Sequence, residues 1–108
     1  PLFSGKSMEL NPGNVAKTRE GKESPVGVDF WAPWCGPCVG FAPVFEEAAA
    51  RMEPYIRFAK LNTEDVPSIG QRWNIRSIPT LILFHHGKEV QRVSGALPMP
   101  QLMRWLHD

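Results

Sequence analysis

One continuous stretch, Val26-Gly27-Val28-Asp29-Phe30-Trp31-Ala32-Pro33-Trp34-Cys35-Gly36-Pro37-Cys38, carries most of the information about fold and chemistry. Its first part, 26–31, is mostly β-branched or aromatic with little polar alternation, which is typical of a central strand covered on both faces. Ala32-Pro33-Trp34 then turns the chain out of that strand. From Cys35 to about Met52, apolar residues recur with a period of about 3.6 residues, which predicts a helix. Both cysteines therefore lie where a buried strand passes into a helix.

The remainder of the chain also alternates between strand and helix patterns. Connections between the earlier strands indicate parallel crossovers, and a turn at His86-Gly87-Lys88 indicates an antiparallel hairpin. We predict an α/β protein in which helices flank both faces of a mixed central sheet of about five strands, with residues 1–108 as a single domain. The predicted strands are 6–10, 26–31, 56–61, 79–84 and 89–94, and the predicted helices are 12–20, 35–52, 65–73 and 98–107.

Two residues mark local features of the predicted helices. Pro43 lies inside helix 35–52 and should kink it, because proline removes the bond to the carbonyl of Val39. Asp65 is a candidate N-cap for helix 65–73.

Composition excludes several classes of protein. The 108 residues carry twelve Lys and Arg against eleven Asp and Glu, a formal charge of +1, which gives no reason to expect a nucleic acid or an anionic membrane as partner. No apolar run approaches the roughly 18 residues of a membrane span, and no signal peptide is visible. The two cysteines are too few for a disulfide-dense secreted scaffold. The chain starts at Pro1 without an initiator Met, so upstream sequence can be missing.

The two cysteines share one motif at the start of the predicted helix. On its first turn their side chains lie on the same side, and they can close a disulfide or open to a dithiol. The helix N-terminus favours negative charge, so we expect a lowered pKa for the Cys35 thiol. Because the thiolate is the nucleophile of disulfide exchange, Cys35 is the predicted attacking residue. Cys38, deeper in the helix, is the predicted resolving residue.

Two other uses of the cysteine pair are less well supported. A structural zinc site needs four ligands, and the remaining candidates are His85, His86 and His107, of which the first two lie in a predicted turn far along the chain. A purely structural disulfide would close only a very short loop, which gains least from cross-linking. We therefore predict a redox pair and no bound metal.

Asp29 and Lys60 each place a charge inside an apolar strand pattern. Asp29 is either exposed on an edge strand or buried behind the cysteines, where burial raises its pKa and lets it act as a base for Cys38. Lys60 either reaches solvent along its stem or lies near Asp29 on a neighbouring strand and partly offsets that raised pKa. We predict that both are catalytic. Pro79, at the start of strand 79–84, is a candidate cis-proline, although the sequence alone favours trans.

Together these residues resemble thioredoxin, and the matches run in order from Val26 to Leu106. The segment 30–38 is similar to that family's active-site segment. The further matches are Asp29 to its buried acid, Pro43 to its helix kink, Lys60 to its buried lysine, Pro79 to its cis-proline and Gly95 to a glycine lining its substrate groove. The chain is most similar to the bacterial thioredoxin-2 type, without that type's N-terminal zinc-binding segment, through residues 1–5, 75–80 and 95–98.

The resemblance implies a thioredoxin fold and a protein-disulfide reductase. Reduced Cys35 attacks a disulfide of a partner protein, and Cys38 then resolves the mixed disulfide. No cofactor is bound beyond the redox-active Cys35–Cys38 disulfide; electrons come from NADPH through a flavin-containing thioredoxin reductase. We expect a cytoplasmic monomer whose partners are that reductase and disulfide-containing proteins. The implied substrate-binding residues are Trp34, Gly36, Pro37, Ile78, Pro79 and Gly95, with the Ile78 backbone as the hydrogen-bonding contact.

The sequence departs from the family at a few positions. Val39 stands where the family usually has Lys or Arg, so activation of Cys35 rests more on the helix terminus, and Gly27 interrupts a strand where an aliphatic residue is usual. Gly36-Pro37 is similar to the reducing members, because oxidases and isomerases usually have a histidine there. Two alternatives stay open: an extracytoplasmic thiol–disulfide oxidant or isomerase, and a non-catalytic binding subunit of the same fold.

Overall fold

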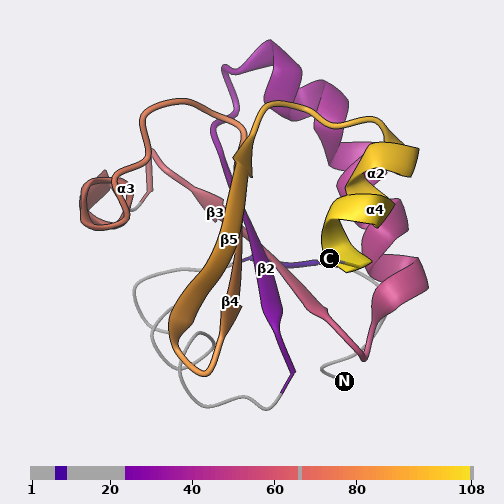
Figure 1. Ribbon diagram of the computed structural model, residues 1–108. Coiled ribbons are helices and arrows are strands. Elements are labelled where there is room, and N and C mark those ends of the chain that lie inside the picture. The colour runs from indigo at the N-terminus through magenta and orange to yellow at the C-terminus, as the bar shows by residue number, and fades with distance from the viewer. Residues whose placement is uncertain (1–6, 10–23, 66, 108) are drawn as a thin grey trace.

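The computed structural model describes residues 7–9, 24–65 and 67–107, which contain a five-stranded sheet and three helices (Figure 1). The strands are β1 (Met8–Glu9), β2 (Val26–Trp31), β3 (Arg57–Asn62), β4 (Thr80–His85) and β5 (Lys88–Ser94). The helices are α2 (Gly36–Met52), α3 (Pro67–Arg72) and α4 (Met99–His107).

The sheet is mixed, and β2 lies at its centre. The strand order is β1-β3-β2-β4-β5. β2 pairs in parallel with β3 and antiparallel with β4; β1 is parallel to β3, and β4 is antiparallel to β5. Every residue of β2 except Trp31 is buried, as expected for a strand with neighbours on both sides and packed side chains on both faces. The predicted mixed sheet with a central strand 26–31 is confirmed.

Helices lie on both sides of this sheet. In Figure 1, α2 and α4 lie together on one side and α3 lies on the other. The core beneath α2 and α4 is built of Phe41, Phe45, Ala48, Ala49, Ile56, Phe58, Leu81, Leu83, Leu102 and Leu106. The core on the opposite face is built of Val26, Val28, Phe30, Ala59, Leu61, Ile82 and Phe84, with Met8, Trp73 and Ile75 packed against it.

Helix α2 begins where the two cysteines lie. Cys35 is its N-cap in an extended conformation, and Pro37 stands in the first turn, where the missing N–H costs no helical bond. Pro43 lies further inside, and α2 continues beyond it to Met52. The proline therefore removes one backbone bond without ending the helix.

Some boundaries differ from the sequence prediction by one or two residues. Helix α3 begins at Pro67, so Asp65 is not its N-cap; Asp65 lies in the preceding turn, where its N–H donates to the Asn62 carbonyl at 3.0 Å. Proline suits a first helical position because that position needs no donor. Strand β4 begins at Thr80 rather than Pro79, because proline cannot donate to the ladder. Strand β3 lies one residue later than predicted, at 57–62.

The predicted hairpin between β4 and β5 is confirmed. His86 and Gly87 both have positive φ, 53° and 77°, as a two-residue turn that matches strand twist requires. At the other end of the chain, the predicted strand 6–10 is present as β1 at Met8–Glu9. The predicted helix 12–20 lies outside the described residues.

Candidate active site

The two cysteines form a disulfide across the first turn of α2. Their Cα atoms are 5.2 Å apart, and both side chains are largely buried. The backbone N–H of Cys38 donates to Cys35 Sγ at 3.1 Å. That N–H is one of the donors a helix N-terminus leaves without a helical partner. The cap therefore directs a donor at the Cys35 sulfur, where it favours the negative charge that reduction produces.

The loop before β4 lies against Cys35 at the same end of the sheet, because Phe30, near the end of β2, pairs with Thr80, the first residue of β4. The Ile78–Pro79 peptide bond is cis, as the family resemblance implied, and the Ile78 carbonyl oxygen lies 3.8 Å from Cys35 Sγ. The Pro79 carbonyl accepts a hydrogen bond of 2.8 Å from the Gly95 N–H. Gly95 has a φ of 103°, which favours glycine. The tertiary structure thus brings Ile78, Pro79 and Gly95 together beside the disulfide. A second cis bond, Glu53–Pro54, was not predicted.

Asp29 is buried, so the edge-strand alternative for it is wrong. Its side chain is 1% exposed, and neither carboxylate oxygen has a hydrogen-bond partner among the described residues. Desolvation by burial raises its pKa to about 7, although the nearby Lys60 ammonium lowers it; Glu46 and Glu9 raise it further. Burial therefore outweighs the opposite charge, and Asp29 changes its protonation state near neutral pH.

Lys60 is the register partner of Asp29 on the neighbouring strand. It is half-buried, and its Nζ lies 4.5 Å from the centroid of the Trp31 ring, in a cation–π contact. Trp31 in turn packs against the buried cluster of Ala32 and the two cysteines. The Lys60 ammonium thus lies against an aromatic ring that itself packs against the redox pair.

The predicted substrate-binding residues surround the disulfide with unequal exposure. Trp34 is 70% exposed. Gly36, Pro37 and Gly95 are also exposed, whereas Ile78 is half-buried and Pro79 is buried.

A groove of about 430 Å³ lies on the α3 side of Trp34. Its walls include Ile75, Arg76 and Ser77 as well as Trp34 and Ile78. The sequence did not identify Ile75, Arg76 and Ser77 as groove residues, because nothing in their residue types distinguishes a groove wall from an ordinary loop.

The described residues contain no group of three or more His, Cys, Asp or Glu side chains that could hold a metal ion. His85 and His86 stack on each other, with ring centroids 4.0 Å apart, at the hairpin turn. None of the described helices is long and apolar enough to cross a membrane.

A disulfide over so short a loop adds little stability, so its chemistry rather than its cross-link explains this geometry. The mixed sheet, the capped cysteine and the cis-proline loop against its sulfur define the class: a thiol–disulfide oxidoreductase. A family model described as thioredoxin matches residues 8–108. The chain belongs to the thioredoxin family, has the thioredoxin fold and is a protein-disulfide reductase.

Named relatives support this assignment over most of the chain. Thioredoxin C-3 of Corynebacterium nephridii is 44% identical over 97% of this chain and 72% of its own length. Thioredoxin 1 of Nostoc is 49% identical over 76% of this chain and 77% of its own. The chloroplastic M-type thioredoxin of Spinacia oleracea is 49% identical over 74% of this chain and 44% of its own.

Proposed function

We propose that Cys35 is the attacking sulfur and Cys38 the resolving one. The observation that carries this assignment is the cap geometry: Cys35 Sγ, not Cys38 Sγ, receives the free N–H of the first helical turn. The Cys35 thiolate attacks one sulfur of a partner disulfide, forming a mixed disulfide and releasing the other partner sulfur as a thiolate. The Cys38 thiolate then attacks Cys35 Sγ, which re-forms the internal disulfide and releases the partner with two thiols.

Asp29 is proposed as the acceptor of the Cys38 proton. It lies on the face of the sheet that α2 covers, because its β4 partner Leu81 belongs to the core beneath that helix. Its raised pKa, about 7, keeps a useful fraction both protonated and ionised near neutral pH. Lys60 is proposed to act with it, since its ammonium opposes the effect of burial on the Asp29 pKa.

The partner chain is proposed to bind in extended form across the face formed by Trp34, Gly36, Pro37, Ile78, Pro79 and Gly95. The Ile78 backbone lies beside the Cys35 sulfur, where a partner strand can pair with it while its own sulfur approaches Cys35. The exposed Trp34 ring supplies apolar contact area next to the same sulfur.

The wider setting is also part of the proposal. A flavin-containing thioredoxin reductase supplies electrons from NADPH, and the protein acts as a monomeric single domain, residues 1–108, in the cytoplasm. Because the relatives include chloroplastic proteins as well as bacterial ones, the compartment rests on the reducing-type Gly36-Pro37 motif alone. Residues 75–80 and 95–98 support the thioredoxin-2 type, whereas the relatives named above are of the C-3, 1 and M types.

The midpoint potential of the Cys35–Cys38 pair tests the direction of electron flow. Equilibration in thiol–disulfide buffers, followed by Trp fluorescence, should give a value of about −270 mV for a reductase. A value between about −180 and −120 mV would instead identify an oxidant or isomerase and exclude the cytoplasmic assignment.

Single cysteine variants test the two roles. Cys38→Ser should accumulate a mixed disulfide with insulin, whereas Cys35→Ser should form none. Accumulation by Cys35→Ser alone would reverse the assignment. Unchanged partner binding after loss of both cysteines would indicate a binding subunit rather than a reductase.

A further inference from the structure

Strand β5 contains a bulge at Val90. Ile82 of β4 pairs with Arg92, but Phe84, two residues later, pairs with Glu89 instead of Val90. In a regular strand, residues three positions apart point to opposite faces. The extra residue reverses this alternation and places Glu89 and Arg92 on one face of the sheet. It is the face of Ile82 and Phe84, both part of the core on the α3 side.

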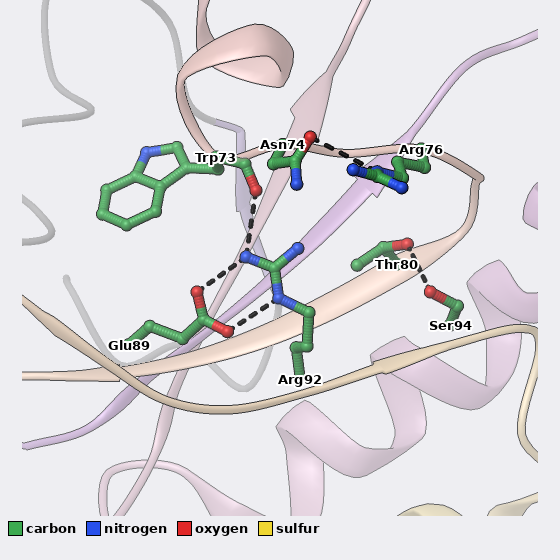
Figure 2. A network of polar contacts seen from close by, with 7 residues as sticks. All are labelled: Trp73, Asn74, Arg76, Thr80, Glu89, Arg92 and Ser94. Carbon is green, nitrogen blue, oxygen red and sulfur yellow. Dashed lines mark hydrogen bonds and ion pairs between the residues drawn. The ribbon is translucent and has the colours of Figure 1, made fainter.

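On that face the two charged side chains form a clamp that reaches the end of α3. Arg92 Nε and Nη2 each donate to one carboxylate oxygen of Glu89 at 2.7 Å, and Nη2 also donates to the Trp73 carbonyl at 2.9 Å (Figure 2). The Trp73 ring packs edge-on against Phe84, with centroids 4.9 Å apart. The Glu89 carboxylate therefore orients a guanidinium that bridges the edge strand to the main chain of another element.

The Trp73 carbonyl is available because of the way α3 ends. Asn74 adopts a left-handed φ of 57°, its N–H donates to the Gln71 carbonyl, and the Ile75 N–H donates to the Gly70 carbonyl. This pattern satisfies two of the last carbonyls of the helix and turns the chain away. The carbonyl of Trp73 takes no part in that pattern and points instead to the guanidinium, as Figure 2 shows.

The chain leaving Trp73 is the loop 74–79, which forms the groove wall and carries the Ile78 backbone to the Cys35 sulfur. Its far end is held to β5 through Thr80, whose hydroxyl donates to the Ser77 carbonyl at 2.6 Å and lies 3.0 Å from the Ser94 hydroxyl. The Arg92 clamp holds the near end to the same strand. Hydrogen bonds to side chains of β5 thus hold both ends of the loop.

We propose that Arg92, oriented by Glu89, is a positioning residue that places the loop 74–79 for partner binding. The inference deepens the proposed function and rests on it. Arg92 contacts neither cysteine, so its loss should weaken partner binding without changing the exchange chemistry.

Single-turnover kinetics with insulin test this role. Reduced protein is mixed with increasing insulin, and Trp fluorescence gives a half-saturating concentration and a limiting rate. Arg92→Gln should raise the half-saturating concentration about three- to tenfold, as expected for losing one partly exposed charged hydrogen bond, and leave the limiting rate unchanged. The midpoint potential and the rate with oxidised glutathione, which needs no extended surface, should also stay unchanged. Glu89→Gln should act in the same direction with a smaller effect, and Arg92→Lys should recover part of the loss.

Arg51→Gln is the matched control, because Arg51 forms a similar exposed ion pair with Glu47 at 2.6 Å, within α2 and away from the loop. It should behave as the parent protein does. The positioning role is overturned if Arg92→Gln binds insulin as tightly as the parent protein or behaves as the Arg51→Gln control does. It is also overturned if Arg92→Gln slows the reaction with oxidised glutathione as much as it weakens insulin binding. If the parent protein itself cannot reduce insulin, the proposed function is wrong. That outcome is distinct from a failure of the positioning role, in which the parent protein reduces insulin normally.

Discussion

Asp29 and Lys60 stand directly opposite each other in the parallel register of β2 and β3. The lysine lowers the pKa of the acid, but desolvation by burial has the larger effect and raises that pKa to about 7. The pair therefore does not behave as an ordinary ion pair, in which the carboxylate would stay ionised well below neutral pH. Instead the carboxyl changes its protonation state near neutral pH, and this has consequences for stability as well as for activity.

Replacing Asp29 should change how stability depends on pH. The folded-state pKa of about 7 lies above the ordinary value of 3.8, so the folded protein holds one more proton between these limits. The stabilisation that this extra proton provides is complete below pH 3.8 and is lost as the pH rises through about 7. The total loss of stability is on the order of 4 kcal/mol. Asp29→Asn should thus stabilise the oxidised protein at alkaline pH but not at acidic pH. Urea unfolding at both extremes checks this, and a pH-independent difference would contradict it.

Removing the positive charge of Lys60 and removing the negative charge of Glu46 should shift the pKa of Asp29 in opposite directions. Lys60→Met removes the group that lowers the pKa, so the pKa should rise. Glu46→Gln removes a group that raises it, so the pKa should fall, while the amide can still accept from the Ser7 backbone N–H. NMR titration of the labelled carboxyl carbon measures both. Shifts of the same sign in the two variants would show that packing, not charge, sets the pKa.

Trp34 should matter for binding and not for folding. Its side chain is 70% exposed, so Trp34→Ala should change the free energy of unfolding by no more than about 0.5 kcal/mol. The same change removes the aromatic wall of the groove beside Cys35, and weaker insulin binding is expected. Urea unfolding and insulin titration separate the two effects; a large loss of stability with unchanged binding would refute this account.

Gly95 should resist substitution for a backbone reason. A Cβ at this position would meet nothing within 4 Å, yet φ is 103°, which L side chains rarely adopt. Gly95→Ala should therefore cost about 1–3 kcal/mol of stability. Gly40→Ala is the matched control, since it is equally free of contacts but helical, and it should stabilise by about 0.5–1 kcal/mol. Equal effects of the two changes on thermal unfolding would contradict the backbone explanation.

Phe45 is expected to be a major contributor to stability. It belongs to α2 and is fully buried, with its ring 5.3 Å from that of Phe58 and 5.9 Å from that of Phe41. Phe45→Ala should destabilise by about 3–5 kcal/mol. Tyr55→Ala, at a side chain that is 78% exposed, should have little effect in the same denaturant titration.

Features that depend on near neighbours could be predicted from the sequence. The strand 26–31, the helix start at the cysteines and the turn at His86-Gly87 follow from local patterning, helix capping and turn chemistry. Boundaries were less certain where a proline adjoined an element, as at Pro67 and Pro79, because its missing donor shifts the first residue of the element.

By itself, then, the sequence determined the alternation of elements and the redox motif, because both arise from residues close together in the chain. Only the tertiary structure decided between an exposed and a buried Asp29, and showed that it is buried with its pKa raised. It also decided the contacts of Pro79 with Gly95 and of Arg92 with Trp73. The physical reason is that a periodic pattern shows which side of a strand is buried, whereas strand order, a bulge in the register and the meeting of distant loops depend on how the whole chain packs.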